Sequence, residues 1–148
     1  VHANLPLVIG NTGIPRSTGE LVGHVRKLKE AHPTIINPII SAIGQLSVSA
    51  AQALQEGDLR RLGGLMNVNH GLLSALGVSN EALDHLVYTA RHAGALGAKL
   101  TGAGGGGCMI ALSMPDKIRK LANAIQKAGG AVMIAKKIDR GVEAWQET

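Results

Sequence analysis

The chain has 148 residues, of which 45% are hydrophobic, and a formal net charge of +5. A chain of this length can bury the core of one domain, and its apolar content excludes an intrinsically disordered protein. Aromatic residues make up 1% of the sequence, with one Trp, one Tyr and no Phe, so the core must be aliphatic. Scattered basic residues and so few aromatic side chains argue against nucleic acid as a partner.

A single cysteine, Cys108, excludes an internal disulfide and favours a reducing, cytoplasmic setting. No run of 18 apolar residues is present, so we expect no membrane-spanning segment. No signal segment, charged and then apolar, opens the sequence either. The sequence begins at Val1 and becomes strand-like almost at once, and we therefore expect it to be a piece of a longer protein.

The first two thirds of the sequence predict one strand followed by four helices. Residues 5–10 are a short apolar run typical of a buried strand, and residues 11–16 are rich in turn-forming types. Each helix carries a start or stop signal. The first runs from a capping box at Ser17 and Glu20 to about Ala31, the second from near Ile36 to Gly57, the third from a cap at Asp58 to Gly77, and the fourth from a cap at Ser79 or Asn80 to about Gly94, with Pro33 marking the break between the first two.

The apolar period then changes from that of helices to that of strands. Residues 96–101 and 108–113 predict strands on either side of a glycine-rich loop. Pro115 opens a fifth helix that Gly129 closes, and residues 131–138 and 142–145 predict two more strands. This order is that of a ferredoxin-like split βαβ arrangement with an expanded four-helix first crossover. We therefore expect an α+β fold, with a mostly antiparallel sheet that helices cover on one face.

The most distinctive stretch is KLTGAGGGGC at residues 99–108. Glycine is costly to order and tolerates positive φ, so this run indicates a loop that lies close to a phosphate or to a neighbouring loop. Gly102, Gly104 and Gly107 fit the GxGxxG spacing, but a strand is expected where the dinucleotide fingerprint requires a helix. No Gly-Lys pair is present, which excludes a Walker A loop. The apolar flanks argue against a flexible linker.

Residues 99–108 resemble the third conserved motif of the GHMP kinases, the superfamily of galactokinase, homoserine kinase, mevalonate kinase and phosphomevalonate kinase. Two further stretches are similar to the mevalonate kinase family within it, of the archaeal kind: IPRST at residues 14–18 with ELV at 20–22, and MNVNHGLL at 66–73 with ALGV at 75–78. The resemblance implies that residues 1–148 form the C-terminal domain of such a kinase, next to an N-terminal domain that this sequence does not contain.

The resemblance also implies the reaction and the site. The full-length enzyme would transfer the γ-phosphoryl group of ATP to the 5-hydroxyl of mevalonate, in isoprenoid biosynthesis. Arg16 and Thr18 would reach the bound mevalonate, and Ala103 would lie at closest approach to it. An arginine suits a substrate that carries a carboxylate. The loop that supports the phosphate-binding region would consist of Thr101, Gly102, Gly104, Gly105, Gly106 and Gly107.

The family's phosphate-cradling loop, catalytic aspartate and early lysine all belong to the N-terminal domain and are absent from these residues. We therefore expect no catalytic residue and no metal site in this chain, and no activity from it alone. ATP and Mg²⁺ would bind mainly to the missing domain. The face that meets that domain should be apolar and uncovered, which predicts self-association or a homodimer.

Two other functions stay open. Another GHMP kinase, such as a phosphomevalonate kinase, would share the glycine loop but differ around residues 14–18 and 66–73. A free-standing ferredoxin-like domain would use the loop to bind a small anion. The coding sequence before Val1 discriminates between them, because a Pro-x-Gly-x-Gly-Leu-x-Ser-Ser segment supports a kinase and a start codon just before Val1 supports the binding domain.

Three further side chains have two interpretations each. His70, beside Asn67 and Asn69, either faces a cleft or is a structural histidine with its hydrogen bonds satisfied. Lys99 either meets an anion or is an ordinary lysine near a strand end, which is the simpler interpretation. Cys108 is expected to be a small buried hydrophobic residue rather than a reactive thiol.

Overall fold

The computed structural model describes residues 5–135. Its four strands form one sheet in the order β2-β3-β1-β4, and all three neighbouring pairs are antiparallel. This confirms the α+β, ferredoxin-like fold with four helices in its first crossover. The strand expected over 142–145 and the end of the strand expected over 131–138 lie outside the described residues. The elements are β1 (Leu7–Asn11), α1 (Thr18–Ala31), α2 (Pro33–Glu56), α3 (Leu59–Ala75), α4 (Glu81–His92), β2 (Gly97–Leu100), β3 (Cys108–Leu112), the 3₁₀ turn η1 (Pro115–Lys117), α5 (Ile118–Lys127) and β4 (Ala131–Ala135).

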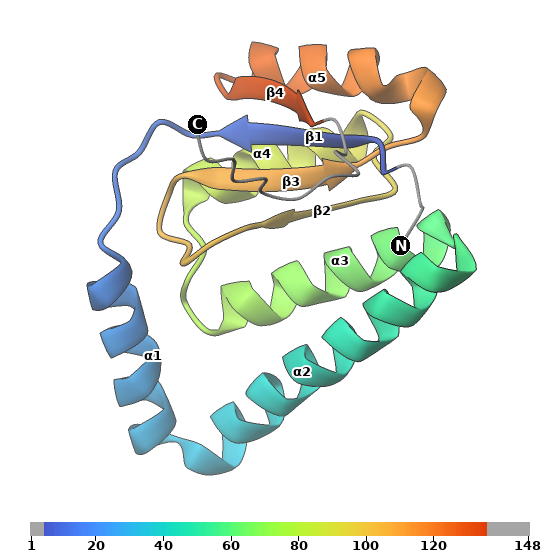
Figure 1. Ribbon diagram of the computed structural model, residues 1–148. Helices are drawn as coiled ribbons and strands as arrows, with labels where there is room; N and C mark the ends of the chain where they lie inside the picture. Colours follow the sequence, from blue (N-terminus) through green and yellow to red (C-terminus); the bar gives the residue numbers. More distant parts are fainter. Residues whose placement is uncertain (1–4, 136–148) are drawn as a thin grey trace, which may run out of the picture.

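Helices α4 and α5 cover one face of the sheet, and α3 runs along its β2 side with α2 packed on α3 (Figure 1). The side chains of a strand alternate between its two faces, so every second residue of β1 and β3 points at α4 and α5. Val8, Met109 and Ala111 are among these residues, and all three are fully buried. They meet buried residues of the two helices, namely Leu83, Leu86, Val87, Ala90, Leu121, Ala122 and Ile125.

Three helices begin at the caps that the sequence predicts. A side-chain oxygen of an N-cap residue accepts a hydrogen bond from a backbone N–H that has no partner in the first turn. Ser17 accepts from the Glu20 amide at 3.4 Å, Asp58 from the Arg61 amide at 2.9 Å, and Asn80 from the Leu83 amide at 2.9 Å. Of the two candidates for the fourth helix, the cap is therefore Asn80.

Two helix starts differ from the prediction, and proline is the reason in both. Helix α2 begins at Pro33 rather than near Ile36, because a proline in the first turn lacks only an N–H that would have no helical partner. Pro115 starts the 3₁₀ turn, and α5 proper begins only at Ile118.

Helix α2 is largely uncovered, with only Ile36 and Ala53 buried. Among the described residues it is the one helix long and apolar enough to cross a membrane, with a mean hydropathy of 1.3 over 18 residues. Length and composition alone are weak evidence for a span, because core helices of globular proteins share both properties. Ile35, Ile40 and Val48 are among its exposed apolar side chains.

Helix α3 packs so closely against the β2 side of the sheet that the contact requires a glycine on each element. A Cβ on Gly97 would overlap the backbone of Gly63, and a Cβ on Gly63 would overlap the carbonyl of Leu96. Glycine at these two positions therefore lets the helix backbone touch the strand backbone. This contact brings polar side chains of α3 within reach of β2.

Candidate functional site

The glycine loop between β2 and β3 has a backbone that only glycine adopts readily. All five of its glycines have positive φ, at +80° for Gly102, +87° for Gly104, +68° for Gly105, +143° for Gly106 and +69° for Gly107. Ala103, the one loop residue with a side chain between them, does not have positive φ. The glycine run is thus required by the conformation of the loop and is not a flexible linker.

The loop is fixed by hydrogen bonds to two other segments. The Gly105 amide donates to the Val78 carbonyl at 2.8 Å, and the Gly107 amide donates to the Ile14 carbonyl at 3.2 Å. The Thr12 amide and hydroxyl both donate to the Gly107 carbonyl, at 2.8 and 3.1 Å. Within the described residues no hydrogen-bond acceptor is found for the amides at positions 102, 103 and 106. Backbone N–H groups grouped in this way favour an anion.

The side chain of Arg16 lies directly on this loop. Its Nη1 donates to the Gly106 carbonyl at 3.1 Å. A Cβ on Gly107 would occupy the position of that Nη1, and a Cβ on Gly102 would lie 3.0 Å from Nη2. In the described part of the chain Arg16 has no carboxylate partner. The fold therefore brings two motifs that are 90 residues apart into one cationic site.

An open groove of about 400 Å³ adjoins Arg16 and the loop. Glu20 and His24 of α1 line it together with Gly77 and Gly105. Sequence reasoning missed both side chains, although positions 20 and 24 recur at the four-residue spacing of one helix face.

The structure shows no contact that assigns a role to Thr18 or Ala103. Thr18 is the exposed first residue of α1, and no hydrogen bond joins it to the loop within residues 5–135. Ala103 is half-buried in the loop. Neither residue lines the groove, so their roles stay predictions.

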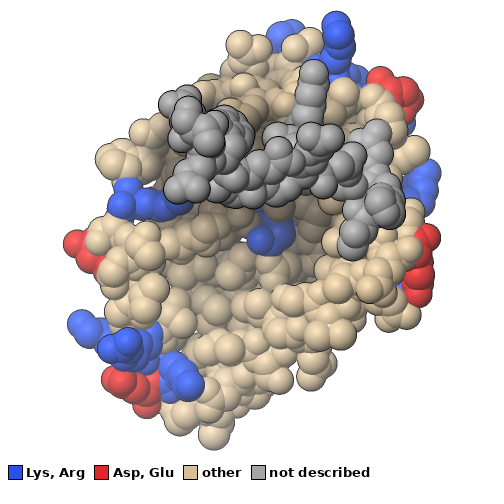
Figure 2. Space-filling view, viewed as in Figure 1, with Lys and Arg blue, Asp and Glu red and all other residues tan. Residues whose placement is uncertain are grey.

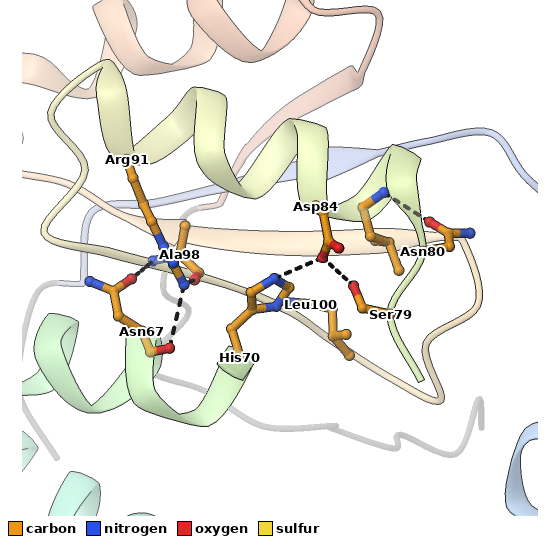
Figure 3. Close-up of polar contacts among 9 residues, drawn as sticks. Asn67, His70, Ser79, Asn80, Asp84, Arg91, Ala98 and Leu100 are labelled. Atoms are coloured by element: carbon orange, nitrogen blue, oxygen red, sulfur yellow. Dashed lines mark hydrogen bonds and ion pairs between the residues drawn. The ribbon is translucent and has the colours of Figure 1, made fainter. Parts of the chain in front are cut away.

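His70 is buried with 2% of its surface exposed and does not face the groove. Its Nδ1 accepts from the Leu100 amide at 3.3 Å, and its Nε2 lies 3.1 Å from Asp84 Oδ1 (Figure 3). Ser79 Oγ donates to the same Asp84 oxygen at 2.5 Å. The pKa of His70 is lowered, chiefly by burial, although the Asp84 carboxylate acts to raise it. Of the two interpretations of His70, the structural one is correct.

Asn67, one turn before His70, hydrogen-bonds to the same edge of β2. Its Oδ1 accepts from the Ala98 amide at 3.0 Å, and Arg91 Nη2 donates to the Ala98 carbonyl at 2.8 Å (Figure 3). Arg91 also lies over the Tyr88 ring, 5.2 Å from its centroid. Side chains of α3 and α4 thus take the place of a neighbouring strand along β2.

Lys99 lies near the end of β2, as the simpler interpretation expects. It is half-buried and lines a cavity of about 180 Å³ between α2 and α3, and burial lowers its pKa. Its Nζ donates to the Leu100 carbonyl at 2.8 Å. Figure 2 shows this face of the molecule hollowed, with Lys or Arg atoms on its floor. Cys108 is half-buried rather than buried.

The family model described as GHMP kinases C terminal matches residues 50–131, which is more than half of the chain. The chain belongs to the GHMP kinase family. The mevalonate kinase of Thermococcus sibiricus is 53% identical to this GHMP kinase domain over 137 residues, 89% of the chain and 41% of that kinase. The mevalonate kinase of Pyrococcus furiosus is 54% identical over 135 residues, with 88% and 40% covered.

A solved structure agrees with these sequences. The L. major mevalonate kinase in complex with R-mevalonate is 36% identical, with a TM-score of 0.85 over 88% of the GHMP kinase domain and 41% of that chain. The chain spans about two fifths of the length of the curated relatives that it matches. The resemblance inferred from three motifs is thereby confirmed.

Proposed function

We propose that this GHMP kinase domain is the C-terminal part of a mevalonate kinase and forms the side of the active site that binds mevalonate. The observation that carries the proposal is the Arg16 guanidinium, held against the glycine loop beside an open groove. The identity of more than half of the aligned residues to archaeal mevalonate kinases supports mevalonate as the substrate.

Arg16 would bind the carboxylate of mevalonate. Its Nη1 is occupied by the Gly106 carbonyl, which fixes the guanidinium plane. Nη2 and Nε then remain for the substrate, and a planar guanidinium suits a carboxylate because two parallel N–H groups match its two oxygens. Thr18 would orient the substrate through its hydroxyl, and Ala103 would contact it.

The loop amides would add to this positive potential. Those at positions 102, 103 and 106 have no acceptor in the described part of the chain, and the loop that carries them contacts Arg16. Fixed dipoles of this kind stabilise negative charge without reorganising during a reaction. The loop would thus support the phosphate-binding region rather than hold all of the phosphates itself.

ATP and Mg²⁺ would bind mainly to the N-terminal domain of the full-length protein. Among residues 5–135 no three His, Cys, Asp or Glu side chains lie together as a metal site would require. Mg²⁺ neutralises charge on the transferred phosphoryl group in kinases. The part of these residues is to bind and orient the acceptor.

The test is steady-state kinetics of the full-length protein, with Arg16→Gln compared with Arg26→Gln. Both arginines are exposed on or next to α1, but only Arg16 touches the loop. We expect R16Q to raise the KM for mevalonate at least about tenfold, the loss of one charged hydrogen-bonding partner, and R26Q to leave it unchanged. Equal KM values for the two variants would contradict the role of Arg16.

The alternative functions give different results in the same assay. Turnover of phosphomevalonate in place of mevalonate would identify another GHMP kinase. Tight binding of ATP by the 148-residue chain alone would favour a free-standing anion-binding domain. We expect neither, and no ATP turnover from this chain without the N-terminal domain.

A further inference from the structure

The glycine loop follows β2, a strand that has a neighbouring strand on only one side. β2 is at the edge of the sheet, so its amides point alternately to β3 and away from the sheet. The Thr101 amide donates to the Cys108 carbonyl of β3 at 3.0 Å. The Leu100 amide, one residue earlier, points outward and is buried, so it needs an acceptor from α3. His70 Nδ1 is that acceptor.

The hydrogen bonds fix the proton on the ring. Because the Leu100 amide donates to Nδ1, that nitrogen carries no hydrogen, and the neutral ring has its proton on Nε2. Nε2 therefore donates to Asp84, which also accepts from Ser79. Each donor in the series from Leu100 through His70 and Asp84 to Ser79 meets an acceptor, so one arrangement is favoured.

This network holds the glycine loop at two points. One is its first residue, through Leu100. The other is the segment at residues 77–79, where Ser79 is tied to Asp84 and the adjacent Val78 carbonyl accepts from the Gly105 amide. A Cβ on Gly104 would overlap that same carbonyl, so segment and loop are in backbone contact.

We propose that His70 is a positioning residue that fixes the glycine loop through its unprotonated Nδ1. It touches neither the groove nor the loop directly and acts through Leu100 and Val78. Protonation of the ring would place two N–H groups against each other and release the Leu100 amide. The charged groups facing the ring are Asp84 and Arg91 from α4 and Lys99 from β2, and α3 itself supplies none.

The consequence for catalysis rests on the proposed kinase function, but the effect on the loop does not. Two variants test the roles of the two ring nitrogens separately. The Oδ1 of His70→Asn lies where Nδ1 does and can still accept from Leu100. The longer side chain of His70→Gln places its amide near Nε2, where it reaches Asp84 and leaves Leu100 without an acceptor.

Amide hydrogen exchange of the 148-residue chain tests the proposal. We expect H70Q to speed exchange at Leu100 and Gly105 at least about tenfold relative to the Ile9 amide of β1, and H70N to stay within about threefold of the wild type. Normalising to Ile9 removes any change in global stability. Equal effects of the two variants, or none at Gly105, would overturn the proposal.

A measurement on the wild type covers the case in which H70Q does not fold. Nitrogen chemical shifts of the imidazole should show an unprotonated Nδ1 and a protonated Nε2. Acidification that protonates the ring should speed exchange at Leu100 and Gly105 relative to the Ile9 amide, which corrects for the slower intrinsic exchange of all amides at low pH. A proton on Nδ1 at neutral pH would overturn the proposal.

Kinetics of the full-length protein then test the catalytic consequence. We expect H70Q to raise the KM for mevalonate and H70N to restore it. An inactive wild type would refute the proposed function and leave the exchange result standing. Unchanged kinetics of H70Q in an active enzyme would refute the catalytic role of the positioning.

Discussion

Gly104→Ala perturbs the contact on which the geometry of the loop depends. An L-residue at φ of +87° costs about 1–2 kcal/mol. The new Cβ also overlaps the Val78 carbonyl, so the segments must separate and the 2.8 Å bond from Gly105 is lost, at about 1 kcal/mol net. Overpacking adds about 1 kcal/mol or more. We expect a total loss of about 3–4 kcal/mol in the free energy of unfolding.

Gly94→Ala is the matched control. Gly94 has φ of +97°, close to that of Gly104, and a Cβ there would meet nothing within 4 Å. G94A should therefore cost only the backbone strain, about 1–2 kcal/mol. The stiffening of the unfolded chain by alanine is common to both variants and cancels in the comparison. The difference between them isolates the contact with Val78.

Urea denaturation of the two variants measures this difference directly. We expect G104A to be less stable than G94A by about 2 kcal/mol, which corresponds to a melting temperature lower by about 4–8 °C. Equal stabilities would refute the inference that the loop is held against residues 77–79. So would a stable G104A variant that keeps the wild-type exchange rate at Gly105.

Three further predictions concern the rest of the domain. Ser17→Ala should lower the free energy of unfolding by about 1 kcal/mol, because the Glu20 amide loses its acceptor, and urea denaturation should show it. The free energy of unfolding should fall as pH falls below 6.5, because burial lowers the folded-state pKa of His70 and the unfolded chain takes up the proton first. Denaturation at pH 7.5 and pH 5 should show a smaller loss of stability in H70N than in the wild type. An equal loss in both would contradict the role of His70. The chain should self-associate through exposed side chains of α2 such as Ile35 and Val48, and sedimentation that finds only monomer at high concentration would count against this.

Local chemistry was sufficient to predict most of the fold. The caps at Ser17, Asp58 and Asn80 each act within three residues along the chain, so their side chains identify them in the sequence. The alternation of the strands and the helical spacing of leucines gave the order of elements. The start of α2 was misplaced because Pro33 is compatible with both a break and a first turn.

Long-range contacts could not be predicted from such local sequence signals. The contact between Gly63 and Gly97, and the bond from Leu100 to His70 across 30 positions, depend on how α3 docks against the sheet. A histidine that completes a sheet edge has the same sequence signature as one in a cleft. His70 therefore had two equal interpretations until its partners were known.

The candidate site came partly from pattern and partly from resemblance. Glycines in a strand-loop-strand setting predict a close backbone contact, which the structure confirms at Val78 and Ile14. That Arg16 would meet this loop followed only from the resemblance to a kinase family. The four-residue spacing of Glu20 and His24 was present in the sequence, but a polar helix face is usually just solvated.

Acceptor competition tests the central claim most directly. The full-length protein is given ATP with equimolar mevalonate, phosphomevalonate, homoserine and galactose, and the phosphorylated products are identified by ³¹P NMR. We predict that 5-phosphomevalonate forms and that R16Q suppresses its formation at low mevalonate concentration while R26Q does not. Phosphorylation of another acceptor in preference to mevalonate, or of none, would contradict the proposal that this domain binds mevalonate for a kinase.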